Sequence, residues 1–267
     1  MKSFSYNSCK ITAVEYEMFA FCSALEAVEI PNTVKNIKDR SFFNCNNLSS
    51  ITFSTLIESI GKQAFYCCYN ISNVILGDNL KHINDEAFYR CSSLKDIKFP
   101  KNLIDIGKSA FSNCYEFKEV KFSNNMYSLG ESVLESCYNV VSVTISRNCK
   151  VGVNAFEGCN NLVTVYLGGN SLFSQNSFDG SHSNSISIIY LGNQDTIDNN
   201  HLLEVQRIQK DIKATCEYVY EKYCDITVIK PSTCSEKNCG EIEKCTCHAI
   251  PKQILSSAVP FLFSKTK

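Results

Sequence analysis

The chain has 267 residues and a formal net charge of −1, which gives no electrostatic basis for binding nucleic acid or an anionic membrane. Hydrophobic residues make up 44% of it, enough to bury a substantial core. Its 16 cysteines are many for an intracellular protein, but the chain is too long to be a small disulfide scaffold.

One pattern recurs along most of the chain at steps of 23 residues that shorten to 22 near its end. The copy AFYRCSSLKDIKF, which begins at Ala87, contains Phe88 and Cys91. The Phe position recurs as Phe19, Phe42, Phe65, Phe111, Leu134, Phe156 and Phe178, and the Cys position as Cys22, Cys45, Cys68, Cys114, Cys137 and Cys159. An apolar residue also precedes each Phe by five positions, as Ile83 does in this copy. Each unit therefore reads I-x-x-x-A-F-x-x-C-x-x-L-x-x-V-x-L.

Each unit predicts one short strand and one tight turn. The segment L-x-x-V-x-L ends in apolar alternation, which indicates a strand with one buried face. The segment A-F-x-x-C spaces its apolar residues by three, as one turn of α- or 3₁₀-helix does. A corner between Cys and Leu often holds asparagine, which tolerates a left-handed backbone and bonds its own main chain. These residues are Asn47, Asn70, Asn139 and Asn161.

A unit this short cannot bury its own apolar face, so the units must stack into one continuous core. Strands about 4.8 Å apart would then form a parallel sheet of about eight short strands, roughly 35 Å long. The sequence therefore predicts a curved solenoid whose concave side is the strand face.

The unit resembles the leucine-rich repeat of BspA-like surface proteins, which occur in bacteria and in some parasitic protists. The segments Ile60–Leu76 and Ile106–Phe122 carry this resemblance most clearly, and it extends over about residues 11–191. It implies a leucine-rich repeat solenoid and, more loosely, a surface antigen or adhesin-like protein. The eighth unit departs from the pattern, with Ser181 at the Cys position and two extra residues before Ile186, as expected of a terminal cap. Its inward-facing residues are then expected to be Ile186, Ile189 and Leu191.

The recurring cysteines are best explained as core residues. A nucleophile needs one special site with a base, and no histidine recurs beside them. A zinc site needs ligands that converge, whereas a column offers a line. Disulfides between successive turns are sterically conceivable, but seven cysteines cannot all pair. We therefore expect small buried hydrophobes with a weak S–H donor.

The outward-facing residues of the strands form the predicted binding face. Lys98 and Lys121 are expected on adjacent strands, with Asp96 and Glu119 beside them. Tyr166 and Tyr190 are expected to form an exposed aromatic pair at the C-terminal end, and Ile75 belongs to the same face. Tyrosine is favoured in contact surfaces because it provides a large area at a low entropic cost. The alternative is a solvated sheet face whose charges simply pair with one another.

The period ends near residue 192, which sets the expected boundary of a solenoid domain over residues 1–192. Residues 193–229 are expected to form a helix and a short extension. Within 198–224 apolar residues recur at helical spacing, and Asp198 or Asn199 could cap the helix. This helix would cover the open end of the solenoid, or alternatively bind a partner or form a coiled coil.

Residues 230–267 are expected to form a cysteine-rich, flexible tail. It contains five residues that could bind zinc: Cys234, Cys239, Cys245, Cys247 and His248. Their spacing is irregular, and a C-x-C pair spans a tetrahedral site less readily than C-x2-C. Free thiols and disulfides are the alternatives. The longest apolar stretch, Ile254–Phe263, is too short for a transmembrane helix.

No enzyme is predicted. The four histidines are scattered, there is no glycine-rich phosphate loop, and no cofactor is indicated. The expected function is a protein-protein interaction module with a protein ligand, and the alternatives are an intracellular scaffold or a metal-binding regulator that uses the tail. The first ten residues lack the apolar run of a signal peptide, which favours a cytoplasmic location, whereas the family resemblance favours the cell surface.

Overall fold

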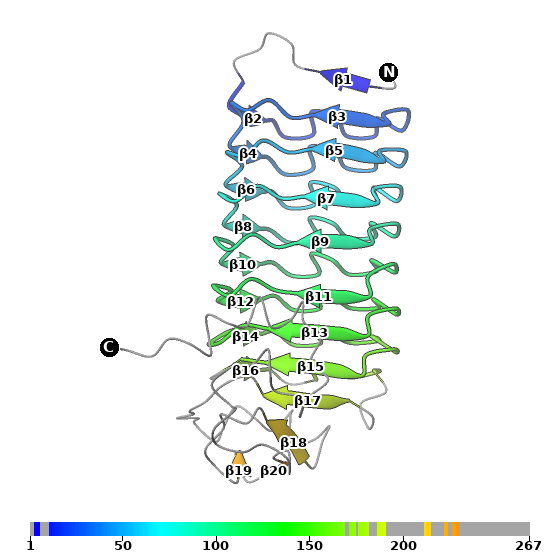
Figure 1. Ribbon diagram of the computed structural model, residues 1–267. Coiled ribbons are helices and arrows are strands. Elements are labelled where there is room, and N and C mark those ends of the chain that lie inside the picture. Colours follow the sequence, from blue (N-terminus) through cyan, green and yellow to red (C-terminus); the bar gives the residue numbers. More distant parts are fainter. Residues whose placement is uncertain are drawn as a thin grey trace, which may run out of the picture.

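The computed structural model describes residues 11–168, 171–174, 176–181 and 186–190, together with short strands at Ser3–Ser5, Asp211–Ala214, Lys222–Tyr223 and Ile226–Ile229. The repeats stack as rungs of a parallel β-solenoid, which confirms the predicted fold (Figure 1). In that view the rungs stand in a nearly straight column, so the strand face predicted to be concave is called the wide sheet below.

Each rung contributes two strands to two separate stacks. The wide sheet contains β3 (Ala27–Glu29), β5 (Ser50–Thr52), β7 (Asn73–Ile75), β9 (Asp96–Lys98), β11 (Glu119–Lys121), β13 (Ser142–Ile145), β15 (Thr164–Leu167) and β17 (Ser187–Tyr190). Before them, β1 (Ser3–Ser5) pairs with β3. The narrow sheet contains β2 (Ala13–Val14), β4 (Asn36–Ile37), β6 (Ser59–Ile60), β8 (His82–Ile83), β10 (Asp105–Ile106), β12 (Ser128–Leu129), β14 (Lys150–Val151) and β16 (Leu172–Phe173). The strands of the wide sheet were predicted, whereas the narrow sheet was not.

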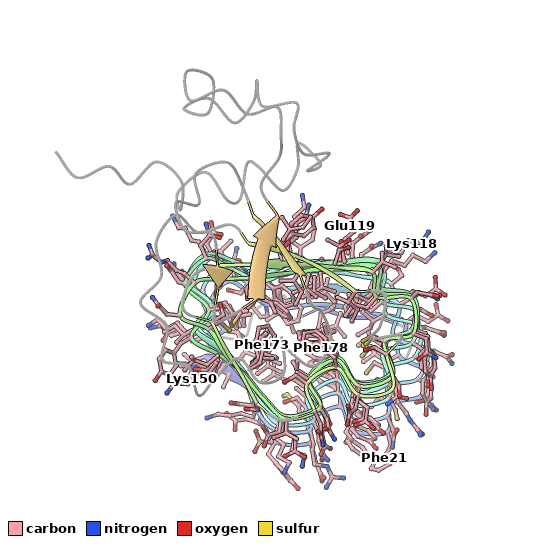
Figure 2. The ribbon with its side chains drawn as sticks, turned by 90° about the horizontal axis from the view of Figure 1, so that it is seen from below. Phe21, Lys118, Glu119, Lys150, Phe173 and Phe178 are labelled. Carbon is pink, nitrogen blue, oxygen red and sulfur yellow. The ribbon has the colours of Figure 1, made fainter. Side chains whose placement is uncertain are left out.

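The third side of each rung, called the turn side, runs from the narrow strand to the Leu position. Figure 2 shows the three sides along the stack: Glu119 lies on the wide sheet, Lys150 on the narrow sheet and Phe21 on the turn side, with Phe173 and Phe178 inside. The core is therefore enclosed by two ladders and a layer of turns.

The turn side contains no helix among the described residues, so the predicted helical turn at A-F-x-x-C is wrong. Two residues per rung have a left-handed backbone, for example Gln63 (φ 55°) and Cys67 (φ 57°). The amides therefore alternate between two kinds of acceptor. That of Phe65 bonds to the Ala87 carbonyl of the next rung at 2.7 Å, and that of Tyr66 bonds within its own rung to Gln63 at 3.2 Å. This alternation gives apolar spacing by three without a helix and extends backbone pairing to the third side.

The recurring phenylalanines form one stack through the core. Phe42, Phe65, Phe88 and Phe111 are fully buried, and neighbouring rings lie 5.1–5.2 Å apart with interplanar angles of 4–12°. The ring spacing follows the spacing of the rungs, so identical side chains at this position reinforce the register of the stack.

The cysteine column is buried, as predicted. Except for Cys22, which is exposed, each thiol of the column is free and fully buried. Each one donates a hydrogen bond to a carbonyl of the preceding rung. Cys68 donates to Phe42 at 3.1 Å, and Cys91 donates to Phe65 at 3.2 Å. Burial raises the pKa of the Cys91 thiol well above its usual value, because the thiolate would lose its hydration.

The corner asparagines act differently from the prediction. The residues with left-handed backbone lie elsewhere in the rung, and the side chains of Asn47, Asn70 and Asn139 bond to the preceding rung instead of their own main chain. Asn47 Nδ2 donates to the Ser23 carbonyl and Asn139 Nδ2 to the Tyr115 carbonyl, each at 2.8 Å. They therefore tie neighbouring rungs together at an exposed corner.

Beyond β17 the wide sheet continues through β18 (Asp211–Ala214), β20 (Ile226–Ile229) and β19 (Lys222–Tyr223). Within the predicted helix over 198–224, residues 211–214 and 222–223 are therefore strands, and the rest of that segment lies outside the described residues. Parallel pairing of β17 with β18 satisfies the open edge of the sheet, and this outweighs the local helical spacing. Of the residues that the structure describes, none forms a helix long and apolar enough to cross a membrane.

Candidate binding surface

The wide sheet presents the predicted polar residues to solvent. Asp96, Lys98 and Glu119 are exposed and Lys121 is half-buried. Ile75, one strand earlier, is 82% exposed, which is unusual for an isoleucine. The strand alternation therefore places these five residues on one face, as predicted.

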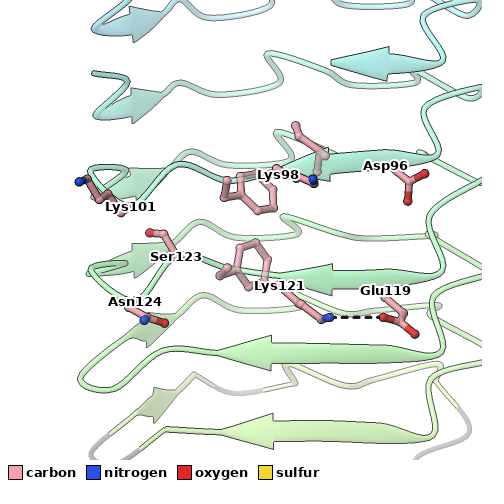
Figure 3. A pocket seen from close by; sticks show the side chains of 10 residues that line it. Asp96, Lys98, Lys101, Glu119, Lys121, Ser123 and Asn124 are labelled. Carbon is pink, nitrogen blue, oxygen red and sulfur yellow. Dashed lines mark ion pairs between the residues drawn. The ribbon is translucent and has the colours of Figure 1, made fainter. Parts of the chain in front are cut away.

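The ladder of the wide sheet is interrupted between β9 and β11. The strands on either side belong to separate sheets of five and seven strands. A hollow of about 520 Å³ lies at this break, and all four predicted charged residues line it (Figure 3). The two flanking strands supply one acid and one lysine each, so the hollow is bordered by both signs of charge.

Bulky residues lie at the ends of the two strands that flank the break. Phe99 and Phe122 occupy consecutive rungs at a position held by Ile30, Leu76 and Leu167 elsewhere. Their rings stack with centroids 5.3 Å apart, close to the 5.2 Å between the core rings of Phe88 and Phe111 in the same two rungs. Ile97, in the middle of β9, is only half-buried, whereas its counterparts in the neighbouring strands are buried. The break in the ladder therefore coincides with two stacked phenylalanines and with a half-buried Ile97.

The charges of the hollow are unequally neutralised. Lys121 Nζ lies 3.6 Å from Glu119 Oε2 on the same strand (Figure 3). Neither Asp96 nor Lys98 forms an ion pair within the described part of the chain. An exposed pair such as Lys121–Glu119 is worth at most about 1 kcal/mol, so a ligand could replace it. Lys98 and Asp96, which form no such pair, are available to a ligand.

Comparison with known proteins identifies the family to which the repeat belongs. A family model described as "BspA type Leucine rich repeat region" matches with six copies, over residues 12–139 and 81–204, which together exceed half of the chain. The chain belongs to this BspA-type leucine-rich repeat family. Leucine-rich repeat solenoids are typically non-enzymatic interaction modules.

Two solved structures are similar to this BspA-type protein. A leucine-rich repeat protein of T. pallidum is 25% identical, with a TM-score of 0.52, and the match covers 60% of this chain and 71% of that one. A leucine-rich repeat protein of Bacteroides ovatus is 21% identical, with a TM-score of 0.41, and the match covers 82% of this chain and 64% of that one. No curated protein matches significantly.

The predicted aromatic pair is wrong. Tyr166 is only 5% exposed, and burial, with a smaller contribution from Glu119, raises its pKa. Tyr166 lies opposite Ile189, whereas Tyr190 lies opposite Leu167, which is buried. In the eighth repeat the buried residues Ile186 and Ile188 are two positions apart, whereas Leu162 and Val165 of the preceding repeat are three apart, so Ile188 enters the core instead of Ile189.

Metal ligands do not converge in the described part of the chain, where no group of three or more suitable side chains could hold an ion. The predicted zinc ligands Cys234, Cys239, Cys245, Cys247 and His248 lie outside the described residues. His82 is half-buried, and its Nδ1 lies 2.8 Å from Asp105 Oδ2 on the narrow sheet.

Sequence reasoning missed an aromatic surface on the turn side. Phe43, Tyr66 and Tyr89 directly follow the core phenylalanines of three successive rungs, and all three are half-buried. Their signal was present as aromatic residues at the 23-residue step, but that position varies between units and so was not treated as part of the repeat.

Proposed function

We propose that the protein is a non-enzymatic interaction module that binds a protein ligand on its wide sheet, around the hollow between β9 and β11. The observation that carries this proposal is the convergence of Asp96, Lys98, Glu119 and Lys121 on one hollow, beside exposed Ile75. An exposed apolar residue next to exposed charged side chains is typical of a protein contact surface. Tyr166 is not part of the proposed site, and Tyr190 is not used in it.

Within this proposal, rim charges mainly set the association rate and its salt dependence, whereas a truncated apolar anchor changes affinity. Ile75→Ala should therefore weaken binding at all salt concentrations, by about tenfold if it is a central anchor. Lys98→Glu should slow association most at low salt.

The test is capture of biotinylated cell-surface proteins by the purified full chain, compared between variants. Lys81→Glu, directly before β8 of the narrow sheet, serves as the matched control for Lys98→Glu, because both lysines are exposed. Loss of the captured species with Lys98→Glu and Ile75→Ala but not with Lys81→Glu is the expected result. Equal effects of all three variants, or none, would place the site elsewhere.

A role as a surface antigen or adhesin-like protein is the finer part of the proposal, and the family resemblance supports it. An epitope-tagged chain should be stained by antibody on intact cells. Staining only after permeabilisation would instead favour an intracellular scaffold with the same binding face.

A further inference from the structure

The turn side carries a column of residues that changes character halfway along the solenoid. In the first rung the residue after the core Phe is Ala20; in the rungs that follow, the residue at this position is aromatic in three, serine in the next and acidic in the last three. In order these residues are Phe43, Tyr66, Tyr89, Ser112, Glu135, Glu157 and Asp179. All but Ser112 are half-buried, so the column is accessible on both sides of it.

The aromatic half is a regular stack. The ring centroids of Phe43 and Tyr66 lie 4.9 Å apart and those of Tyr66 and Tyr89 lie 4.8 Å apart, both with interplanar angles of 12°. Phe21, which is 61% exposed, extends the stack edge-on at 5.5 Å from Phe43. It lies on the opposite side of the solenoid from the proposed wide-sheet site (Figure 2). Stacked rings present their edges and hydroxyl groups outward, and tyrosine hydroxyls can donate hydrogen bonds.

An arginine without a carboxylate partner lies in this aromatic half. The guanidinium of Arg90 is exposed and lies 5.5 Å from the ring centroid of Tyr89. No carboxylate pairs with it within the described part of the chain. Arg40, by contrast, already pairs with Glu17 at 3.0 Å. Arginine and tyrosine are both enriched in protein contact surfaces. The N–H donors of the Arg90 guanidinium are suited to binding a carboxylate.

The acidic half has the complementary property. Neither Glu135 nor Glu157 forms an ion pair with a basic residue of the described chain. Glu135 Oε2 lies only at the limit of hydrogen bonding from Ser112 Oγ, at 3.5 Å. The rungs of Glu135 and Glu157 therefore hold carboxylates one above the other, and neither carboxylate pairs with a cation of the described chain.

We infer that a second copy of this chain docks on the turn side in antiparallel orientation, with the two-fold axis near Ser112. Tyr89 and Glu135 lie one rung before and after Ser112, and Tyr66 and Glu157 lie two rungs before and after it. Reversal of one copy therefore places each tyrosine opposite a carboxylate, and places Arg90 near Glu135 of the other copy. Such a contact is isologous, so every pairing occurs twice.

The size of this face predicts a weak dimer. Eight rungs at about 4.8 Å give a strip roughly 35 Å long, and its width is that of two or three columns of side chains. The buried area then falls at the low end for specific complexes, which corresponds to reversible association in the micromolar range. Because the contacts join charged side chains that are accessible to solvent, association should weaken as salt screens these charges.

The test is sedimentation equilibrium of the reduced full chain at low and high salt, over a concentration range of about 1–300 μM chosen to bracket the micromolar association predicted above. Three variants reverse the proposed pair: Arg90→Glu, Glu135→Arg and the two together. Each single change should raise the dimer dissociation constant by at least about tenfold, and the double change should restore it to within about threefold. Arg147→Glu is the matched control, because Arg147 is exposed and follows β13, away from the turn side. Circular dichroism checks that all variants fold.

A wild-type chain that stays monomeric at low salt over this range would overturn the inference. So would a dimer that ignores Arg90→Glu and Glu135→Arg, or one that Lys98→Glu on the wide sheet dissociates. Failure of the double variant to recover would overturn the antiparallel pairing of these two residues. None of these outcomes bears on ligand binding at the wide sheet, which is assayed separately.

Discussion

Corresponding side chains have the same environment in successive rungs of this solenoid. Two consecutive residues whose side chains lie on opposite sides of the backbone can therefore be compared directly. Phe88 is fully buried within the phenylalanine stack, whereas Tyr89 is half-buried on the turn side. Phe88→Ala should lower the free energy of unfolding by about 3–5 kcal/mol, because it leaves a cavity between two rings. Cys91→Ala removes a smaller group and should cost about 1–2 kcal/mol.

Guanidinium unfolding followed by circular dichroism measures both values. Tyr89→Ala is the control, and a smaller loss is expected because its ring is partly in water. A Tyr89→Ala variant less stable than Phe88→Ala would show that the core does not lie where the structure places it.

The cysteine column also predicts how stability responds to alkali. Burial raises the pKa of Cys45 and of Cys159 to about 12, from 9.0. The folded state therefore holds these protons over a range in which the unfolded chain has released them. This stabilisation is complete below pH 9 and is lost as the pH rises from 9 towards 12, by up to about 1.4 kcal/mol per pH unit for each thiol.

Urea unfolding at pH 8–10.5 measures this slope. Cys45→Ala should unfold with a shallower pH dependence than the wild type, because it lacks one of the linked protons. Peptide mapping with iodoacetamide supplies an independent check. Cys22 should be alkylated in the native protein, and Cys68, Cys91 and Cys114 only after unfolding. An unchanged slope together with fast native alkylation of the column would contradict burial.

At this scale the sequence predicted the core better than the binding face. The buried cysteines, the phenylalanine column and the outward position of Lys98 all follow from one period and from strand alternation. The prediction for Tyr166 was wrong because strand alternation gives the side of the sheet on which a residue lies, but not whether other residues cover that side. The strand register of the eighth repeat was not predicted because the irregular spacing within that repeat changes the parity, which pairs Tyr190 with Leu167 and not with Tyr166.

Among the elements, the interrupted ladder between β9 and β11 is the feature with a direct consequence. Amides that lack a partner strand exchange with solvent through small local openings. The backbone amides of β9 and β11 should therefore exchange faster than those of β13 and β15, by at least about tenfold on average.

Hydrogen exchange followed by nuclear magnetic resonance measures these rates. Replacing Phe122 with isoleucine, the residue found at Ile145 in the next rung, should let the rungs approach and slow exchange in β9 and β11. Phe173→Ile, at a distant rung, is the control. Equal protection across all four strands in the wild type would mean that the ladder is continuous.

The strands of the wide sheet could be predicted from alternation, but two other elements could not. The narrow strands are only two residues long, so each shows one buried position and no alternation. The turns at A-F-x-x-C share their spacing by three with a helix, and only left-handed residues such as Gln63 and Cys67 distinguish the two. Most of the residues at these positions are neither glycine nor asparagine, so their identity did not indicate a left-handed backbone; Gly158 and Gly180 in the last two repeats are exceptions.

At the scale of the whole molecule, the repeat predicted the solenoid and its length, because each rung must cover the next. What it could not predict is how the last rung is covered. The segment 198–224 has helical spacing, yet its residues 211–214 pair with β17 as a strand. Pairing with an existing edge is a property of the assembled sheet, so a local pattern cannot show it.

This end of the sheet can be tested by shortening the chain at the two boundaries expected from the sequence. A chain that ends at residue 229 keeps β18, β19 and β20, which continue the sheet beyond β17. A chain that ends at residue 192 leaves the backbone groups of β17 without their partner strand. Such an edge exposes unpaired donors and acceptors and is a template for aggregation. The shorter chain should therefore melt at a lower temperature and aggregate on heating, whereas the chain ending at 229 should melt within about 2 °C of the full chain, since it loses no described pairing. Thermal unfolding by circular dichroism, with light scattering to detect aggregation, separates the two. A chain ending at 192 that is as stable and soluble as the full protein would show that β18–β20 contribute nothing to the end of the solenoid.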